Sequence, residues 1–118
     1  MFGSLLVADG RPDAYVLMTP DATFANWFVK YLLRGKGSAS DYQAAFAPLD
    51  PVNYVGDAEP GSIFLQFGKS DPYVPGYLAD KFEAAAPDAK VGEYDGGHEL
   101  DAKARAERLA WLREKLGL

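Results

Sequence analysis

The chain has 118 residues, 48% of them hydrophobic and 14% aromatic, which is enough for one domain with a packed core. Its net charge of −5 argues against a nucleic acid partner, because phosphate binding needs clustered Lys and Arg. The absence of cysteine and the single histidine exclude disulfides, thiolate nucleophiles and polyhistidine metal sites, so we expect neither a metal nor a cofactor. No apolar run reaches the roughly 18 residues of a membrane span, and residues 1–7 are too short for a secretory signal, so we expect a cytoplasmic protein without membrane contact.

The first half of the chain predicts one strand followed by a helical excursion. The nearly continuous apolar run at 14–18 predicts a strand covered on both faces. Residues 19–60 show no strand pattern but are rich in aromatic side chains, which indicates helices with a role of their own. Two helices are expected there. The first is capped by Asp21 or Thr23 and runs to Leu33, and Gly35, Lys36 and Gly37 break it. The second is capped by Ser40 and runs to Phe46.

The second half predicts alternating strands and helices. Strands are expected at 62–67 and 90–94, separated by a helix at 75–86, which together form a βαβ crossover between parallel strands. The run at 90–94 alternates in polarity, so this strand is expected near an edge. A last helix is expected at 99–116 with Leu109, Leu112 and Leu116 as its apolar stripe and Gly117 as its C-cap. The pattern therefore predicts an α/β fold, with a three-stranded parallel sheet and flanking helices, in a single domain over residues 1–118.

Two residues that carry chemistry follow two of these strands. Asp71 comes just after the strand at 62–67, and His98 just after the strand at 90–94. Each alone is more often a turn residue, but together they would lie at the carboxyl edge of a parallel sheet, where such sheets bind ligands. A carboxylate there accepts a hydrogen bond from imidazole Nδ1 and leaves Nε2 free to take a proton from a nucleophile.

These motifs resemble a known family. Residues 62–116 are similar to the end of the α/β-hydrolase superfamily, in which a strand, G-x-x-D-x-x-V-P, a helix, a strand, G-x-H and a helix follow one another. The resemblance implies that Asp71 is the acid and His98 the histidine of a catalytic triad. Residues 48–55 resemble the stretch before the acid strand in dienelactone-hydrolase-like and peptidase-like members, and the excursion at 19–60 is expected to be cap-like, either covering the sheet or lining a substrate pocket.

The nucleophile of that family has no counterpart in this sequence. The family places it on a G-x-S-x-G elbow between a strand and a helix, and the oxyanion-hole donors lie on the elbow and an earlier loop. Residues 1–8 resemble the apolar helix that follows this elbow in the family. Ser4 lacks the second glycine and a preceding strand, so we interpret it as a residue of that helix, and Ser70 as part of the turn beside Asp71. Asp50 is a possible substitute acid that falls ahead of the strand, and Asp95 is interpreted as a turn residue.

We therefore expect the C-terminal portion of an α/β-hydrolase domain, for hydrolysis of a small-molecule ester or related acyl substrate, nearly inactive alone. Two alternatives stay open: a non-catalytic α/β interaction module, and a fragment of the dehalogenase or epoxide-hydrolase type with an aspartate nucleophile upstream. Because the strand at 14–18 is expected to expose an unpaired hydrophobic edge, we also expect self-association.

Overall fold

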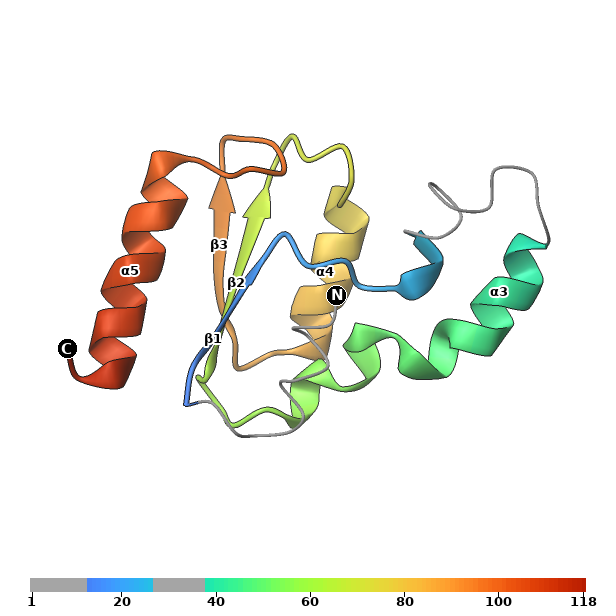
Figure 1. The fold of residues 1–118 in the computed structure, drawn as a ribbon, viewed down its shortest axis with the longest axis horizontal. Helices are drawn as coiled ribbons and strands as arrows, with labels where there is room; N and C mark the ends of the chain where they lie inside the picture. The colour runs from blue at the N-terminus through green and yellow to red at the C-terminus, as the bar shows by residue number, and fades with distance from the viewer. Residues whose placement is uncertain (1–12, 27–37) are drawn as a thin grey trace.

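The fold is built on a small parallel sheet. A computed structural model of the chain describes residues 13–26 and 38–118. Its strands are β1 (Tyr15–Met18), β2 (Ile63–Gly68) and β3 (Lys90–Tyr94), hydrogen bonded in the order β1-β2-β3 with both pairs parallel (Figure 1). The predicted α/β fold with a three-stranded parallel sheet is confirmed, and β3 is an edge strand as its alternating pattern indicated.

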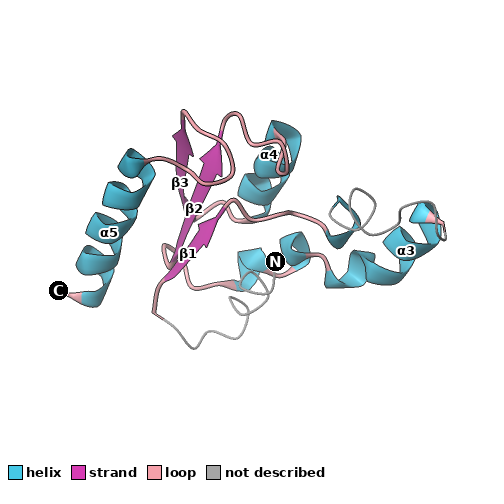
Figure 2. Ribbon diagram, turned by 45° about the horizontal axis from the view of Figure 1, so that its top comes forward, coloured by secondary structure: helices cyan, strands magenta, loops and turns pink. Residues whose placement is uncertain are grey.

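One helix covers each face of the sheet, as Figures 1 and 2 show: α4 (Gly76–Ala85) lies on one side and α5 (Ala102–Leu116) on the other. Successive β2 residues point to opposite faces, which explains why all six are buried. The face towards α4 carries the main core, which contains Tyr15, Leu17, Ala22, Val55, Ile63, Leu65, Phe67, Val74, Leu78, Ala79, Phe82 and Ala86. The crossover through α4 brings the carboxyl ends of β2 and β3 to the same edge.

The α5 helix differs from its prediction in two ways. It begins at Ala102 rather than residue 99, because Leu100 has a left-handed φ of 58° and Asp101 caps the helix by accepting from the Ala104 N–H at 2.7 Å. The predicted leucine stripe is also wrong, since Leu109 and Leu116 are half exposed. Other side chains of α5 face the sheet in place of these leucines.

Helix α5 contacts the sheet through a different set of side chains. The ring of Trp111 packs on Phe64 of β2, with centroids 5.6 Å apart, and Ala104 is fully buried. The guanidinium of Arg108 donates to the Gln66 side chain in the same face. These contacts turn the leucines outward. The predicted C-cap is confirmed: Gly117 has a left-handed φ of 65°.

The excursion is helical but forms little core. After a helical turn at 24–26, the described chain resumes with α3 (Ala39–Phe46) and three short 3₁₀ helices, η2 (Ala47–Leu49), η3 (Pro51–Asn53) and η4 (Val55–Asp57). Helix α3 has no buried residue, whereas η3 and η4 contact α4. Ser38, not Ser40, caps α3 by accepting from the Asp41 N–H. The interpretations of Ser4, of the helix at 1–8 and of the helix end at residues 27–37 lie outside the described residues.

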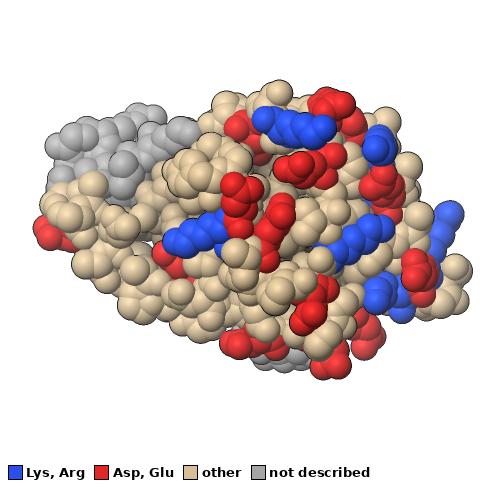
Figure 3. Space-filling model, turned by 180° about the vertical axis from the view of Figure 1, so that it is seen from behind, with Lys and Arg blue, Asp and Glu red and all other residues tan. Residues whose placement is uncertain are grey.

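Charged side chains are interspersed over the face shown in Figure 3, where acidic and basic groups lie side by side. Ion pairs between such exposed groups include Lys69 with Asp95 and Lys103 with Glu107. Exposed pairs of this kind contribute little to stability because water screens them. In the described ranges, no helix has the length and apolar character to cross a membrane.

Candidate functional site

Asp71 lies in a tight turn directly after β2. The Asp71 N–H donates to the Gly68 carbonyl at 3.1 Å, which reverses the chain, and the carboxylate turns back into the protein. Its Oδ1 accepts from the backbone N–H groups of Tyr73 and Val74 at 2.8 and 3.1 Å. The side chain is 1% exposed, so these bonds replace the water that burial removes.

The loop after β2, which carries Asp71 (the acid loop), and the loop after β3, which carries His98 (the histidine loop), are joined by backbone hydrogen bonds. The N–H of Lys69 donates to the Tyr94 carbonyl and the N–H of Ser70 to the Gly96 carbonyl, both at 3.0 Å. Gly68 makes the close approach possible, because a Cβ there would lie 2.6 Å from the Gly96 oxygen and closer still to that of Gly97. Ser70 thus shapes the turn, as its position predicted.

An exposed ion pair spans the same two loops. The Lys69 ammonium lies 2.7 Å from the Asp95 carboxylate. The hydrogen bond between them raises the pKa of Lys69 and lowers the pKa of Asp95. Asp95 is a turn residue at the surface, so it does not compete with Asp71 for the imidazole.

The two predicted site residues meet. His98 Nδ1 lies 2.9 Å from Asp71 Oδ2, so the contact expected from the spacing of the strands is confirmed. The imidazole is 42% exposed while its carboxylate partner is buried. The ring of Tyr73 stands edge-on against the imidazole, with centroids 5.0 Å apart and planes at 78°. The imidazole is therefore held at one nitrogen and along one side.

This geometry has a defined chemical consequence. An ionised carboxylate only accepts hydrogen bonds, so Nδ1 of His98 must be the donor and the neutral ring carries its proton there. The lone pair then lies on Nε2, where it can take a proton from a hydroxyl. The carboxylate can in turn stabilise the imidazolium that forms.

Backbone strain gathers at the same edge of the sheet. Thr19, directly after β1, and Leu100, two residues after His98, have φ values of 44° and 58°. Such values are costly for residues other than glycine, above all for a β-branched one, and strained residues cluster at functional sites. Both strained positions border the loops that carry the Asp71–His98 pair.

The segment after β1 is attached to the acid loop. The Asn26 side-chain amide donates to Asp21 at 2.7 Å and to the Tyr73 carbonyl at 3.3 Å. Thr23 caps the helical turn by accepting from the Asn26 N–H, which agrees with one of the two predicted caps. The start of the excursion thus lies beside the residues that surround His98.

Asp50 does not act as a second acid for His98 in the described structure. Its carboxylate accepts from the Phe24 N–H at 2.8 Å and so joins the two ends of the excursion. Burial raises the pKa of Asp50, and the hydrogen bond from Phe24 and the charge of Lys81 oppose this, while Asp21 adds to it. Its role is structural, because it binds a backbone amide far along the chain.

Sequence reasoning missed Tyr73 and Asn26. Tyr73 lies inside the acid motif, two residues after Asp71, but an aromatic residue in a turn carries no pattern that assigns it to the imidazole. Asn26 had no detectable pattern at all, since its contacts join segments 47 positions apart. Gln66 did carry a usable pattern: a lone polar residue in a continuous apolar strand needs buried partners.

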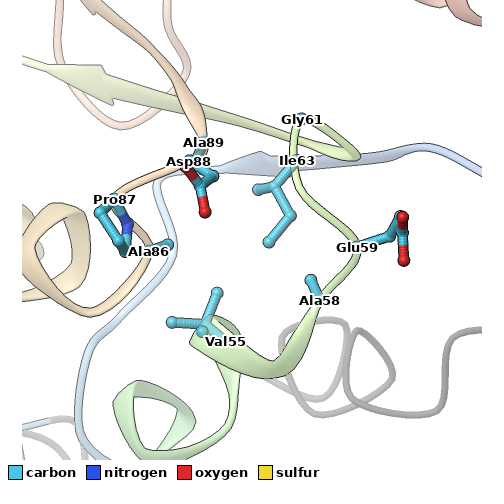
Figure 4. A pocket seen from close by; sticks show the side chains of 10 residues that line it. Val55, Ala58, Glu59, Gly61, Ile63, Ala86, Pro87, Asp88 and Ala89 are labelled. Atoms are coloured by element: carbon cyan, nitrogen blue, oxygen red, sulfur yellow. The ribbon is translucent and has the colours of Figure 1, made fainter.

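A small cavity lies at the opposite edge of the sheet, where β2 and β3 begin (Figure 4). It has a volume of about 20 Å³, room for roughly one water molecule. Its lining includes Val55, Ile63, Ala86 and Pro87. Since it lies away from Asp71 and His98, it is not part of their site. In the part of the chain that the structure describes, no group of three His, Cys, Asp or Glu side chains could hold a metal ion.

Comparison with known proteins bears on the fold. No family model matches the sequence, and no curated protein matches it. The structure is similar to that of an esterase from Pyrococcus furiosus, with a TM-score of 0.56 and 14% sequence identity. The match covers 97% of this chain and 48% of the esterase chain, so this chain spans about half the length of that protein. At this identity the likeness establishes a shared α/β fold.

Proposed function

We propose that this chain supplies the acid, Asp71, and the base, His98, of an α/β-hydrolase catalytic triad that hydrolyses a small-molecule ester or a related acyl substrate. The hydrogen bond between His98 Nδ1 and Asp71 Oδ2 is the observation that carries this proposal. It is the arrangement in which a buried carboxylate orients an imidazole for proton transfer.

Further observations support the same function. The pair lies at the carboxyl edge of a parallel sheet, the edge at which open α/β sheets bind their ligands. Two residues that follow strands at this edge, Thr19 after β1 and Leu100 two residues after His98, have left-handed φ values. The similar Pyrococcus furiosus protein is an esterase.

The nucleophile is the part of the triad that the proposal leaves to another segment. The sequence holds no G-x-S-x-G elbow. Of the described serines, Ser38 and Ser40 lie at the start of α3, Ser62 is buried ahead of β2, and Ser70 belongs to the acid turn. The 118 residues alone are therefore expected to hydrolyse an activated aryl ester near the buffer rate, because a base accelerates acyl transfer only through a hydroxyl within its reach.

The test is hydrolysis of an activated aryl ester by a longer chain in which a strand and a G-x-S-x-G elbow precede these residues. We expect turnover that falls roughly 10³- to 10⁴-fold in Asp71→Asn and at least as much in His98→Ala. Asp95→Asn is the matched control, because it also removes a carboxylate from the same loops but has no contact with the imidazole; its turnover should stay near that of the unsubstituted chain.

Turnover that survives His98→Ala would reject the proposal, and turnover by the 118 residues alone that is lost in Ser4→Ala would show that Ser4 is the nucleophile. An aspartate nucleophile, the alternative of the dehalogenase and epoxide-hydrolase branches, predicts turnover of an epoxide or haloalkane in place of the aryl ester. That outcome would keep the roles of Asp71 and His98 and change the substrate class.

A non-catalytic interaction module is the second candidate function. Strand β1 pairs only with β2 among the described residues, and Met18 and Leu109 are about half exposed. Open strand edges and exposed apolar side chains recruit other chains, here a second copy. Light scattering over a range of concentrations tests this, since a strictly monomeric species would argue against self-association.

A further inference from the structure

The side chain of Gln66 is a polar group in the middle of the sheet. Gln66 lies in the central strand β2, on the face covered by α5, and is completely buried. Its neighbours on that face include Phe64, which packs on Trp111. A buried amide is tolerated only when hydrogen bonds replace the water it loses.

The partners of this amide lie on both sides of the histidine loop. Gln66 Nε2 donates to the Tyr94 hydroxyl at 3.0 Å and to the Ala104 carbonyl at 2.8 Å. Tyr94 is the last residue of β3, and Ala104 lies in the first turn of α5. His98 is carried by the segment between them. One NH₂ group therefore ties together the two ends of the loop that holds the imidazole.

Further hydrogen bonds join α5 to the same part of the sheet. The Tyr94 hydroxyl donates to Glu107 at 2.8 Å, and Arg108 donates to Gln66 Oε1 at 2.8 Å, so α5 is bonded to the sheet through two successive residues. Burial raises the pKa of Tyr94, and its hydroxyl thus keeps the proton that it donates to Glu107.

The tyrosine can reach Gln66 because of a glycine. Gly92 lies opposite Gln66 in the register of β2 and β3, and the Tyr94 ring folds back over it. A Cβ at Gly92 would lie 2.8 Å from the ring carbon that bears the hydroxyl. The sequence thus clears a place for the hydroxyl beside the buried amide.

We propose that Gln66 is a positioning residue for His98: by fixing the separation of β3 and α5, it sets the place of the imidazole against Asp71 without touching either side chain. The inference rests on the proposed function in that it takes Asp71 and His98 as the working pair. Asp71 follows the strand that contains Gln66, so one strand controls both members of the pair.

The single histidine makes the position of the imidazole directly measurable. In protein labelled with ¹⁵N-histidine, NMR reports which ring nitrogen carries the proton and how fast the Nδ1 proton exchanges with water. The bond to Asp71 predicts a protected Nδ1–H in the unsubstituted chain, and Asp71→Asn supplies the reference for its loss.

The test variant is Gln66→Met, which keeps the length of the side chain and removes its hydrogen bonds. We expect exchange of the Nδ1 proton to accelerate roughly tenfold or more, the factor that about 1.4 kcal/mol provides. Phe82→Leu is the control, because Phe82 belongs to the core on the opposite face of the sheet. It should lower stability and leave the exchange of the Nδ1 proton unchanged at temperatures where the protein is folded.

Tyr94→Phe provides a milder second variant if Gln66→Met does not fold. It keeps the ring and removes only the hydroxyl that accepts from Gln66, so we expect a smaller acceleration in the same direction. Unchanged Nδ1 exchange in a folded Gln66→Met, or in Tyr94→Phe where only that variant folds, would overturn the inference. An equal acceleration in Phe82→Leu would also overturn it, because the effect would then follow stability alone.

Failure of this inference is distinguishable from failure of the proposed function. The NMR measurement needs no nucleophile and no substrate. Nδ1 protection that depends on Gln66, together with an elbow-bearing chain whose hydrolysis survives His98→Ala, would keep the positioning role and reject the hydrolase role. Hydrolysis that depends on His98, together with Nδ1 exchange that is unchanged in Gln66→Met, would keep the hydrolase role and reject the positioning role.

Discussion

Helices α3 and α5 start alike and finish in different surroundings. Each begins at a polar side chain that accepts a backbone N–H three residues on, Ser38 in α3 and Asp101 in α5. Yet α5 buries Ala104 and Trp111 against the sheet, whereas α3 buries nothing. Capping is a local interaction, so it decides where a helix begins, but it carries no information about what the helix will contact.

The aromatic residues of α3 illustrate the same difference. The rings of Tyr42 and Phe46 stack on each other with their centroids 4.3 Å apart, and the ring centroid of Phe24 lies 6.3 Å from that of Phe46. In α5 the aromatic contact of Trp111 is instead with Phe64 of the central strand. An aromatic residue stabilises the fold in proportion to the surface it buries, so the two helices should respond very differently to substitution.

The largest effect is expected at the α5 contact. Trp111→Ala removes a buried indole and should lower the free energy of unfolding by about 3–5 kcal/mol, or prevent folding altogether. Leu109→Ala on the same helix is the matched control and should change it by no more than about 0.5 kcal/mol, because Leu109 is half exposed. Denaturant unfolding followed by circular dichroism measures both. An equal loss of unfolding free energy in the two variants would indicate that the leucines of α5 pack against the sheet.

The glycine between the two site loops should give the next largest effect. Gly68→Ala pushes a methyl group against two backbone oxygens of the histidine loop and should cost about 1–3 kcal/mol. Gly76→Ala, at the start of α4, meets nothing within 4 Å and should be neutral or stabilising. Thermal unfolding compares the two. If Gly68→Ala left both stability and Nδ1 protection unchanged, the close contact of the loops would not matter.

The stacked rings of α3 should matter less than either. Phe46→Ala is expected to lower the free energy of unfolding by at most about 1 kcal/mol, because Phe46 is already 37% exposed and α3 buries no residue. Amide hydrogen exchange should show α3 losing protection while α5 keeps it. A loss as large as that of Trp111→Ala would mean that α3 has a buried partner surface.

The smallest effect is expected at Asp50, and it depends on pH. Burial raises the pKa of Asp50 above its ordinary value of 3.8, so the folded state holds the proton more tightly than the unfolded state. The stability that this gives is complete below about pH 3.8 and is lost as the pH rises through the folded-state pKa. Asp50→Asn keeps an acceptor for Phe24 without the buried charge.

The free energy of unfolding of Asp50→Asn, relative to that of the unsubstituted chain, should therefore be higher at pH 7 than at pH 3.5. Urea unfolding at the two pH values measures the difference, and Asp57→Asn, an exposed aspartate of η4, is the control. A relative stability that moves in the opposite direction would show that the hydrogen bond from Phe24 outweighs burial.

Much of the site followed from the sequence because local patterns and one topological rule determine it. Nearly continuous apolar runs predicted β1 and β2, and the helix between β2 and β3 predicted that these two strands are parallel. In a parallel sheet joined by one helix, residues that follow neighbouring strands meet at one edge. The contact between Asp71 and His98 could therefore be predicted from their positions after β2 and β3.

Only the tertiary structure decided which face of α5 is buried, what Gln66 bonds and which ring lies against His98. The leucines at 109 and 116 have the right period, but burying them would turn away Arg108 and Ala104, which the buried amide of Gln66 needs. Periodicity measures how apolar a face is, while rotation of a helix on a sheet also depends on hydrogen bonds to residues about 40 positions away. A short window of sequence marks Gln66 as a polar residue in an apolar strand that needs partners, but it does not identify those partners.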